Sequence, residues 1–97
     1  MVKIQQARVQ VEALWMRGQQ HQAEGRFDEA IQAYDMALRR RPKWPQALYN
    51  KGVMHTLMKQ FRKAVACYEA TIRLDPNGRM GHKAKQALKS LRIKLPK

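Results

Sequence analysis

The sequence is periodic, with a repeat of 34 residues over most of its 97-residue length. Shifting it by 34 positions aligns nine pairs of identical residues: Ala13/Ala47, Leu14/Leu48, Gly18/Gly52, His21/His55, Phe27/Phe61, Ala30/Ala64, Tyr34/Tyr68, Arg39/Arg73 and Pro42/Pro76. The repeating units are residues 11–44 and 45–78. A period of this length is typical of repeat proteins, in which each unit is one supersecondary element that buries its apolar face against the next unit.

Each unit is predicted to form two helices joined by a turn. The first helix is expected to start near Lys3, upstream of the repeat, because one helical face is lined by Ile4, Ala7, Val11, Leu14 and Gly18. Gly25 is predicted to end this helix, with Phe27 in the turn and Asp28 at the start of the second helix. Pro42 and Pro45 exclude a continuation of the second helix, because proline lacks an N–H and clashes with the preceding turn. The second unit repeats this plan.

A fifth helix is predicted over residues 79–95, ended by Pro96. Its apolar stripe is Ala84, Leu88, Leu91 and Leu95, and its basic stripe is Lys85, Lys89 and Arg92. Stacked repeats leave an apolar face at the end of the stack, so a terminal helix with a polar outer face is required there. The length of the chain fits one domain over residues 1–97.

The pattern resembles the tetratricopeptide repeat, whose signature over 34 residues is W-x2-L-G-x2-Y…A-x3-F…P. The matching residues are Leu14, Gly18, Ala30, Tyr34 and Pro42 in the first unit and Leu48, Gly52, Ala64, Tyr68 and Pro76 in the second. Arg17 and Lys51 replace the usual leucine, and their stems are expected to pack while their charged heads reach water. His21 and His55 replace the usual tyrosine. The resemblance implies an all-α fold of right-handed helical hairpins, a tetratricopeptide-like αα superhelix with two repeats and a capping helix.

The resemblance also implies where a ligand binds, because the first helix of each hairpin lines the concave side in this family. We call the following residues the concave face: Trp15, Gln19, Gln22, Tyr49, Asn50, Val53, Thr56 and Lys83. Met80 is also expected to line it. Aromatic side chains beside amides suit a peptide or a partner helix. The implied function is therefore a non-catalytic protein–protein interaction module.

One subset of the family grips the C-terminal carboxylate of heat-shock chaperones with a Lys–Asn–Asn–Lys–Arg clamp. The matching positions in this chain hold Trp15, Gln19, Asn50, Met80 and Ala84. Only Asn50 agrees, so capture of a chaperone C-terminus is not expected.

The formal net charge is +13, from 20 Lys and Arg against 7 Asp and Glu. We call the densest groups of cations the basic patch: Arg39, Arg40, Arg41 and Lys43 after the first hairpin, and Lys85, Lys89 and Arg92 on the terminal helix. These charges are expected to lie on the outer surface or rim, largely away from the concave face. With Lys83 they would steer an acidic protein or peptide ligand.

Two other functions stay open. The basic patch suits association with nucleic acid, although the chain carries no motif that reads DNA or RNA and offers few aromatic rings for stacking. Self-association as a scaffold is the other interpretation, because two repeats are fewer than the three or more usual in a stable array. Residues 81–97 also fit a basic amphipathic helix for a membrane surface or a calmodulin-like partner, but the capping role already explains their apolar stripe.

Catalysis, a metal site and a cofactor are not expected. The chain has three histidines, and the spacing of His21 and His55 follows from the repeat rather than from a site. The single cysteine, Cys67, has no apparent base beside it, and no glycine-rich phosphate loop is present. The longest apolar run is too short for insertion into a membrane, and a cytoplasmic location is expected.

Overall fold

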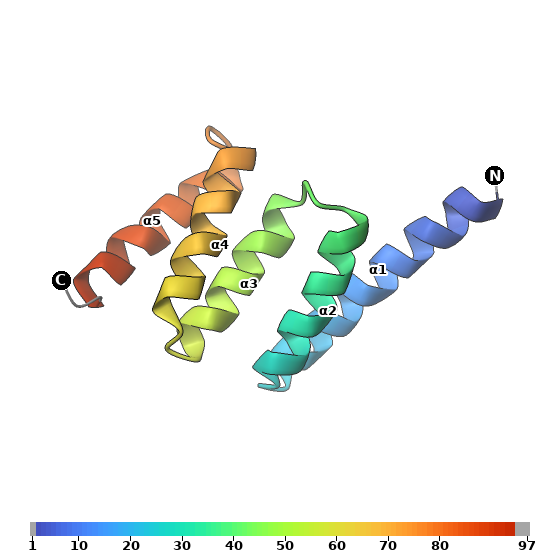
Figure 1. The fold of residues 1–97 in the computed structure, drawn as a ribbon, viewed down its shortest axis with the longest axis horizontal. Helices are drawn as coiled ribbons and strands as arrows, with labels where there is room; N and C mark the ends of the chain where they lie inside the picture. Colours follow the sequence, from blue (N-terminus) through green and yellow to red (C-terminus); the bar gives the residue numbers. More distant parts are fainter. Residues whose placement is uncertain (1, 95–97) are drawn as a thin grey trace.

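We describe the fold from a computed structural model, which describes residues 2–94 and, for side chains, residues 9–92. The described chain forms α1 (Val2–Ala23), α2 (Phe27–Arg40), α3 (Pro45–Leu57), α4 (Phe61–Leu74) and α5 (Arg79–Lys94), and it contains no strand. The helices follow one another along the long axis of a molecule of 51 × 30 × 17 Å (Figure 1). The expected all-α fold of helical hairpins with a capping helix is confirmed. Leu95 and Pro96 lie outside the described residues, as do the side chains of Ile4 and Ala7.

Two core clusters hold the hairpins together, and a tyrosine of a second helix is buried in each. Tyr34 of α2 packs with Ala30 and with Met54 of α3, so the first cluster joins the two hairpins. Tyr68 of α4 packs with Ala64, Ala84, Leu88 and Leu91, so the second cluster joins the second hairpin to α5. Successive hairpins are thus stacked by apolar burial rather than by the connecting turns.

Both hairpins turn through a residue in the left-handed conformation. Gly25 has φ +77°, and the N–H of Arg26 donates to the carbonyl of His21 at 2.8 Å. In the second hairpin Lys59 has φ +62°, and the N–H of Gln60 donates to the carbonyl of His55 at 2.8 Å. This six-to-one hydrogen bond satisfies a terminal carbonyl of the first helix. The role predicted for Gly25 is confirmed.

The expected start of the second helix is wrong by one residue. Phe27 is the first residue of α2 rather than part of the turn, and Asp28 lies in the first turn of the helix. The N-cap is Arg26, which makes no side-chain capping hydrogen bond. The negative charges of Asp28 and Glu29 instead stabilise the N-terminus of α2, because the exposed N–H groups there carry partial positive charge.

The start of α5 is held by Asp75, whose carboxylate accepts hydrogen bonds from the N–H of Met80 at 3.0 Å and of Gly81 at 3.4 Å. The side chain of Lys85 donates to the carbonyl of Pro76 at 2.9 Å. Met80 is only 9% exposed, so its expected place on the concave face is wrong. The tight turn into α5 directs Met80 into the interior.

Candidate ligand-binding face

Three residues spaced 34 apart, Trp15, Tyr49 and Lys83, lie on α1, α3 and α5. The ring of Trp15 is tilted against Tyr34, with centroids 5.3 Å apart and planes at 46°. Tyr49 is tilted against Tyr68 in the same way, at 5.6 Å and 48°. Each half-buried ring therefore rests on the tyrosine of its own second helix, and this support limits the number of orientations it adopts.

The cation of Lys83 lies over the ring of Tyr49, with Nζ 5.9 Å from the ring centroid. This distance is within the range of a cation–π interaction. It also shows that α3 and α5 present Tyr49 and Lys83 to the same side. The structure thus brings together two residues of the concave face that belong to different helices.

A second tryptophan completes the aromatic surface. Trp44, in the turn between α2 and α3, stacks on Trp15 with centroids 4.7 Å apart and planes at 30°. The guanidinium of Arg41 lies 4.6 Å from the Trp44 centroid. Sequence reasoning missed Trp44 as a member of this surface; the only signal was a tryptophan held in a short turn between two prolines. Arg41 of the basic patch therefore lies beside the aromatic surface to which Trp15 belongs.

Gln22 and Asn50 are linked through the hydroxyl of Tyr34. The Tyr34 hydroxyl donates a hydrogen bond to Oε1 of Gln22 at 2.7 Å and accepts one from Nδ2 of Asn50 at 3.5 Å. The side-chain amide of Gln46 donates to Oδ1 of Asn50 at 3.0 Å. Burial raises the pKa of the Tyr34 hydroxyl, and the hydrogen bond from Asn50 opposes this rise. These amides, expected to bind a ligand, therefore also hold the interface of the two hairpins.

Thr56 has the corresponding place in the second hairpin. The Thr56 hydroxyl donates a hydrogen bond to the carbonyl of Gly52 at 2.8 Å. Because its proton is used there, it accepts the hydrogen bond from the hydroxyl of Tyr68, which lies 3.2 Å away. Burial raises the pKa of Tyr68 as well. Among the other members of the concave face, Gln19 is exposed and Val53 is half-buried against both core clusters.

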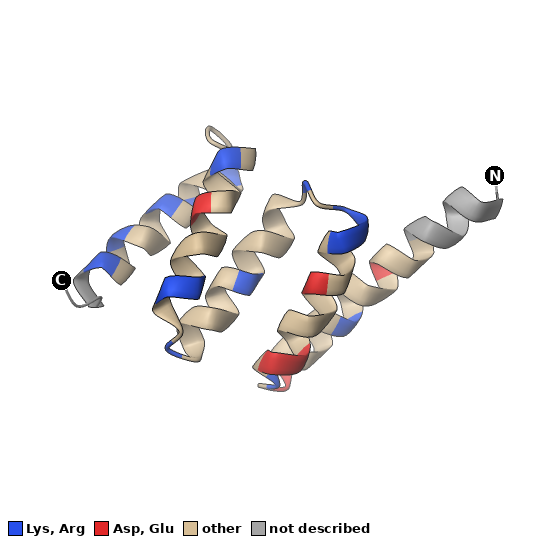
Figure 2. Cartoon of the chain, in the orientation of Figure 1, with Lys and Arg blue, Asp and Glu red and all other residues tan. Residues whose placement is uncertain are grey.

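All seven residues of the basic patch are exposed. They form two separate groups, one at the end of α2 and in the turn that follows it, the other along α5 (Figure 2). Acidic residues gather mainly on α1 and α2 in the same view. The seven residues of the patch therefore fall into two groups, and Figure 2 shows further Lys and Arg residues on α3 and α4 between them.

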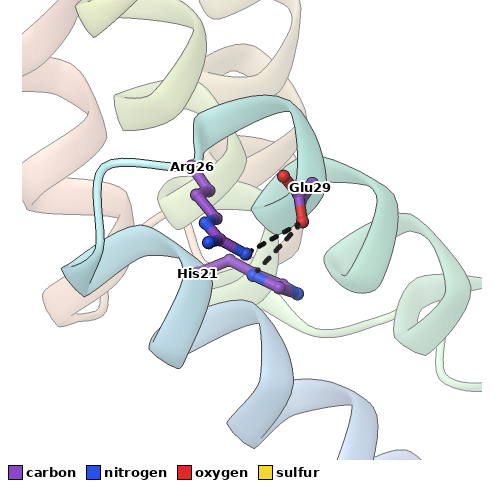
Figure 3. Close-up of polar contacts among 3 residues, drawn as sticks. All are labelled: His21, Arg26 and Glu29. Carbon is purple, nitrogen blue, oxygen red and sulfur yellow. Dashed lines mark ion pairs between the residues drawn. The ribbon is translucent and has the colours of Figure 1, made fainter.

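Each of the two repeat-equivalent histidines contacts a polar side chain of its own hairpin. His21 Nδ1 lies 3.7 Å from a carboxylate oxygen of Glu29, which Arg26 approaches to 3.8 Å (Figure 3). His55 Nδ1 lies 2.8 Å from Oε1 of Gln60. Each histidine therefore connects the end of a first helix to the turn or helix that follows.

Metal-binding groups and the single thiol are the remaining candidates for chemistry in the part of the chain that is described. That part holds no group of three or more His, Cys, Asp or Glu side chains able to bind a metal ion. Cys67 is buried, and burial raises the pKa of its thiol, with Lys51 opposing the rise and Asp35 adding to it. None of the described helices has the length and apolar character needed to cross a membrane.

Comparison with known proteins agrees with this geometry. Two family models, both described as tetratricopeptide repeat, match the chain over residues 11–54 and 45–77. Together they cover both hairpins. No curated protein matches the chain.

Proposed function

This chain belongs to the tetratricopeptide repeat family, and we propose that it binds an acidic peptide or partner helix on the concave face. Repeats of this family generally serve protein–protein interaction. The observation that carries the proposal is the pair of repeat-equivalent rings, Trp15 and Tyr49, each resting on a buried tyrosine. Supported rings lose little conformational freedom when a ligand covers them, so they suit the role of binding anchors.

The acidic character of the ligand is inferred from the cations beside these rings. Lys83 lies against Tyr49, and Arg41 lies against Trp44, which stacks on Trp15. Positive charges at the border of an apolar surface accelerate the approach of an acidic partner and fix its orientation. A basic or neutral peptide gains nothing from these two cations.

Association with nucleic acid is the second candidate function. The exposure of Arg39, Lys89 and Arg92, together with the rest of the basic patch, supports it, because accessible cations replace the counterions of phosphates. The division of the patch into two groups supports it less, because a nucleic-acid strand would need to follow both groups.

The test begins with selection of acidic peptides from a displayed peptide library on the intact chain. Binding of a selected, fluorescein-labelled peptide is then measured by fluorescence polarisation, beside a labelled single-stranded RNA. Trp15→Ala with Tyr49→Ala is expected to lower peptide affinity by about 1000-fold, since anchor residues each contribute about 2 kcal/mol or more and about 1.4 kcal/mol corresponds to tenfold. The affinity for RNA is expected to stay nearly unchanged.

Two further variants keep this test decisive. Lys83→Glu reverses one charge without removing a supported ring, and it is expected to weaken the acidic peptide about tenfold at low salt. Arg39→Glu with Lys89→Glu and Arg92→Glu is the matched control, expected to weaken RNA far more than peptide. Peptide affinity that is indifferent to both the ring variants and Lys83→Glu overturns the proposal. Circular dichroism verifies that each variant is folded.

A further inference from the structure

A groove lies between α1 and α2, outside the concave face. It has a volume of about 190 Å³ and is lined by Gln10, Ala13, Leu14, Arg17, Met36 and Arg40. We call it the α1–α2 groove. None of its lining residues belongs to the set that forms the concave face.

The position of Ala13 in the groove has equivalents 34 and 68 residues further along the chain, and both are covered. Ala13 of α1 is exposed, whereas the equivalent residues Ala47 of α3 and Gly81 of α5 are buried. Ala47 lies on the helix that packs against α2, and Gly81 lies on the helix that packs against α4. A Cβ at Gly81 would collide with the backbone of Asp75, directly after α4. The surface that is exposed at Ala13 is therefore the one that receives a second helix in the rest of the molecule.

Exposed apolar side chains border the same surface. Val9 and Met16 are 62% and 65% exposed and lie on one side of α1 with Ala13, at spacings of four and three residues. Met36 of α2 lines the groove and is 42% exposed. The residue equivalent to Met16 is Asn50, which donates a hydrogen bond to Tyr34 of the helix that covers it. A contiguous set of exposed large apolar side chains marks an interaction site.

The charges indicate the chemistry of the missing helix. The residue equivalent to Arg17 is Lys51, whose ammonium lies 2.6 Å from the carboxylate of Asp35 on the covering helix α2. Arg17 and Arg40 both line the α1–α2 groove and are exposed. A helix that covered the groove as α2 covers α3 would place a carboxylate beside Arg17, whose guanidinium pairs readily with carboxylates.

The described part of the chain supplies no helix that covers the groove. In the second unit the covering helix is connected through the turn at residues 41–44. The equivalent residues 7–10 belong to the continuous helix α1, so the turn at residues 41–44 has no counterpart there. A second copy of this chain carries a formal net charge of +13, which disfavours its approach to Arg17 and Arg40.

We propose that the α1–α2 groove docks an acidic amphipathic helix of another protein, in the manner in which α2 docks on α3. This docking is independent of the concave face. The molecule then has two interaction surfaces, one for a ligand that lies across the first helices and one that extends the stack by a helix in trans.

The experiment uses the intact chain and a probe that is known to fit the equivalent surface. The probe is a fluorescein-labelled peptide with the sequence of α2, Phe27–Arg40, acetylated and amidated at its ends. Binding is measured by fluorescence polarisation up to about 1 mM, the weak end of specific association, because an isolated helix of this length is only marginally formed in water. We expect saturable binding.

Charge reversal and obstruction then locate the bound probe. Arg17→Glu is expected to weaken binding about tenfold, and a probe with Asp35→Lys is expected to recover the loss on that variant. Ala13→Glu is expected to abolish binding, because it fills the groove from an exposed position. Arg62→Glu on α4 is the matched control and should leave the affinity within about twofold, as expected for a distant exposed charge.

Three results overturn the proposal. The first is the absence of saturable binding by the probe. The second is binding that Ala13→Glu and Arg17→Glu leave unchanged, which means that the probe displaces the chain's own α2. The third is a dimer, seen by analytical ultracentrifugation, that Ala13→Glu dissociates, since a second copy would then be the occupant. Trp15→Ala with Tyr49→Ala is expected to leave probe binding unaffected, because neither ring lines the groove, so failure of this inference and failure of the proposed function are distinguishable.

Discussion

The ring of Tyr34 lies directly against the backbone of Gly18, so that a Cβ at position 18 would be 2.5 Å from Cε1 of the ring. Tyr68 has the same relationship to Gly52, where the corresponding distance is 2.6 Å. The glycine on the first helix and the tyrosine on the second thus form one contact that is repeated in both hairpins. This contact sets how closely the two helices approach.

Gly18→Ala is expected to destabilise the chain by about 1–3 kcal/mol, because the added methyl forces the buried ring or the helices apart. Guanidinium denaturation followed by circular dichroism measures the change. In the double variant Gly18→Ala/Tyr34→Leu the loss should be smaller than the sum of the two single losses, since the smaller side chain leaves space for the methyl. Additive losses would contradict a steric origin.

Lys59→Gly is expected to stabilise the chain by about 0.5–1 kcal/mol, because Lys59 occupies the left-handed conformation that Gly25 occupies in the first hairpin. Thermal unfolding detects the change as a higher Tm. The matched control is Glu69→Gly at an exposed position inside α4, which should cost about 1 kcal/mol through the loss of helix propensity. A lower Tm for Lys59→Gly would refute the argument.

The ion pair between Lys51 and Asp35 is expected to contribute about 0.2–1 kcal/mol, because the Asp35 side chain is 42% exposed and solvent screens the pair. A double-mutant cycle with Lys51→Met and Asp35→Asn measures this coupling by chemical denaturation. In 1 M NaCl the coupling should shrink towards zero, since the Debye length is then about 3 Å. A coupling that salt leaves unchanged would mean that the side chains interact through packing instead.

Stability is expected to fall as the pH rises above about 9. Burial raises the pKa of Cys67 from 9.0 and the pKa values of Tyr34 and Tyr68 from 10.0. The unfolded chain therefore loses these protons first, so the stabilisation is complete below the ordinary pKa values and is lost as the pH rises through the raised ones. Denaturation midpoints at pH 7, 9 and 10.5 measure the decline.

Tyr34→Phe with Tyr68→Phe is the companion variant for the pH measurement. It removes two of the three groups named above, so its decline above pH 10 should be shallower than that of the parent chain. An equal decline in both proteins would assign the effect to other groups.

The positions of the helices were predictable, because apolar spacing, Gly25 and the proline pair act within a few residues of the chain. The left-handed backbone conformation of Lys59 was not predictable, since a lysine side chain gives no local signal for it. Lys59 adopts this conformation because the turn of the second hairpin is closed by the same backbone hydrogen bonds as the turn of the first. The ion pair of Lys51 was not predictable either, because its partner Asp35 comes from the preceding hairpin.

The period of 34 in the sequence established the hairpin plan, because this plan follows from short-range spacing that both units share. The apolar stripe after the second unit indicated the capping helix. The contacts of Gly18 with Tyr34 and of Gly52 with Tyr68 became visible only in the tertiary structure. Contacts that the units do not share depended on packing in three dimensions. Trp44 has Gly78 as its equivalent, so nothing in the repeat indicated that it stacks on Trp15 or that Arg41 lies over it. The exposure of Ala13 was likewise decided by the tertiary structure, in which the equivalent residues Ala47 and Gly81 are buried. Burial depends on which helix lies opposite a residue and not on the residue itself.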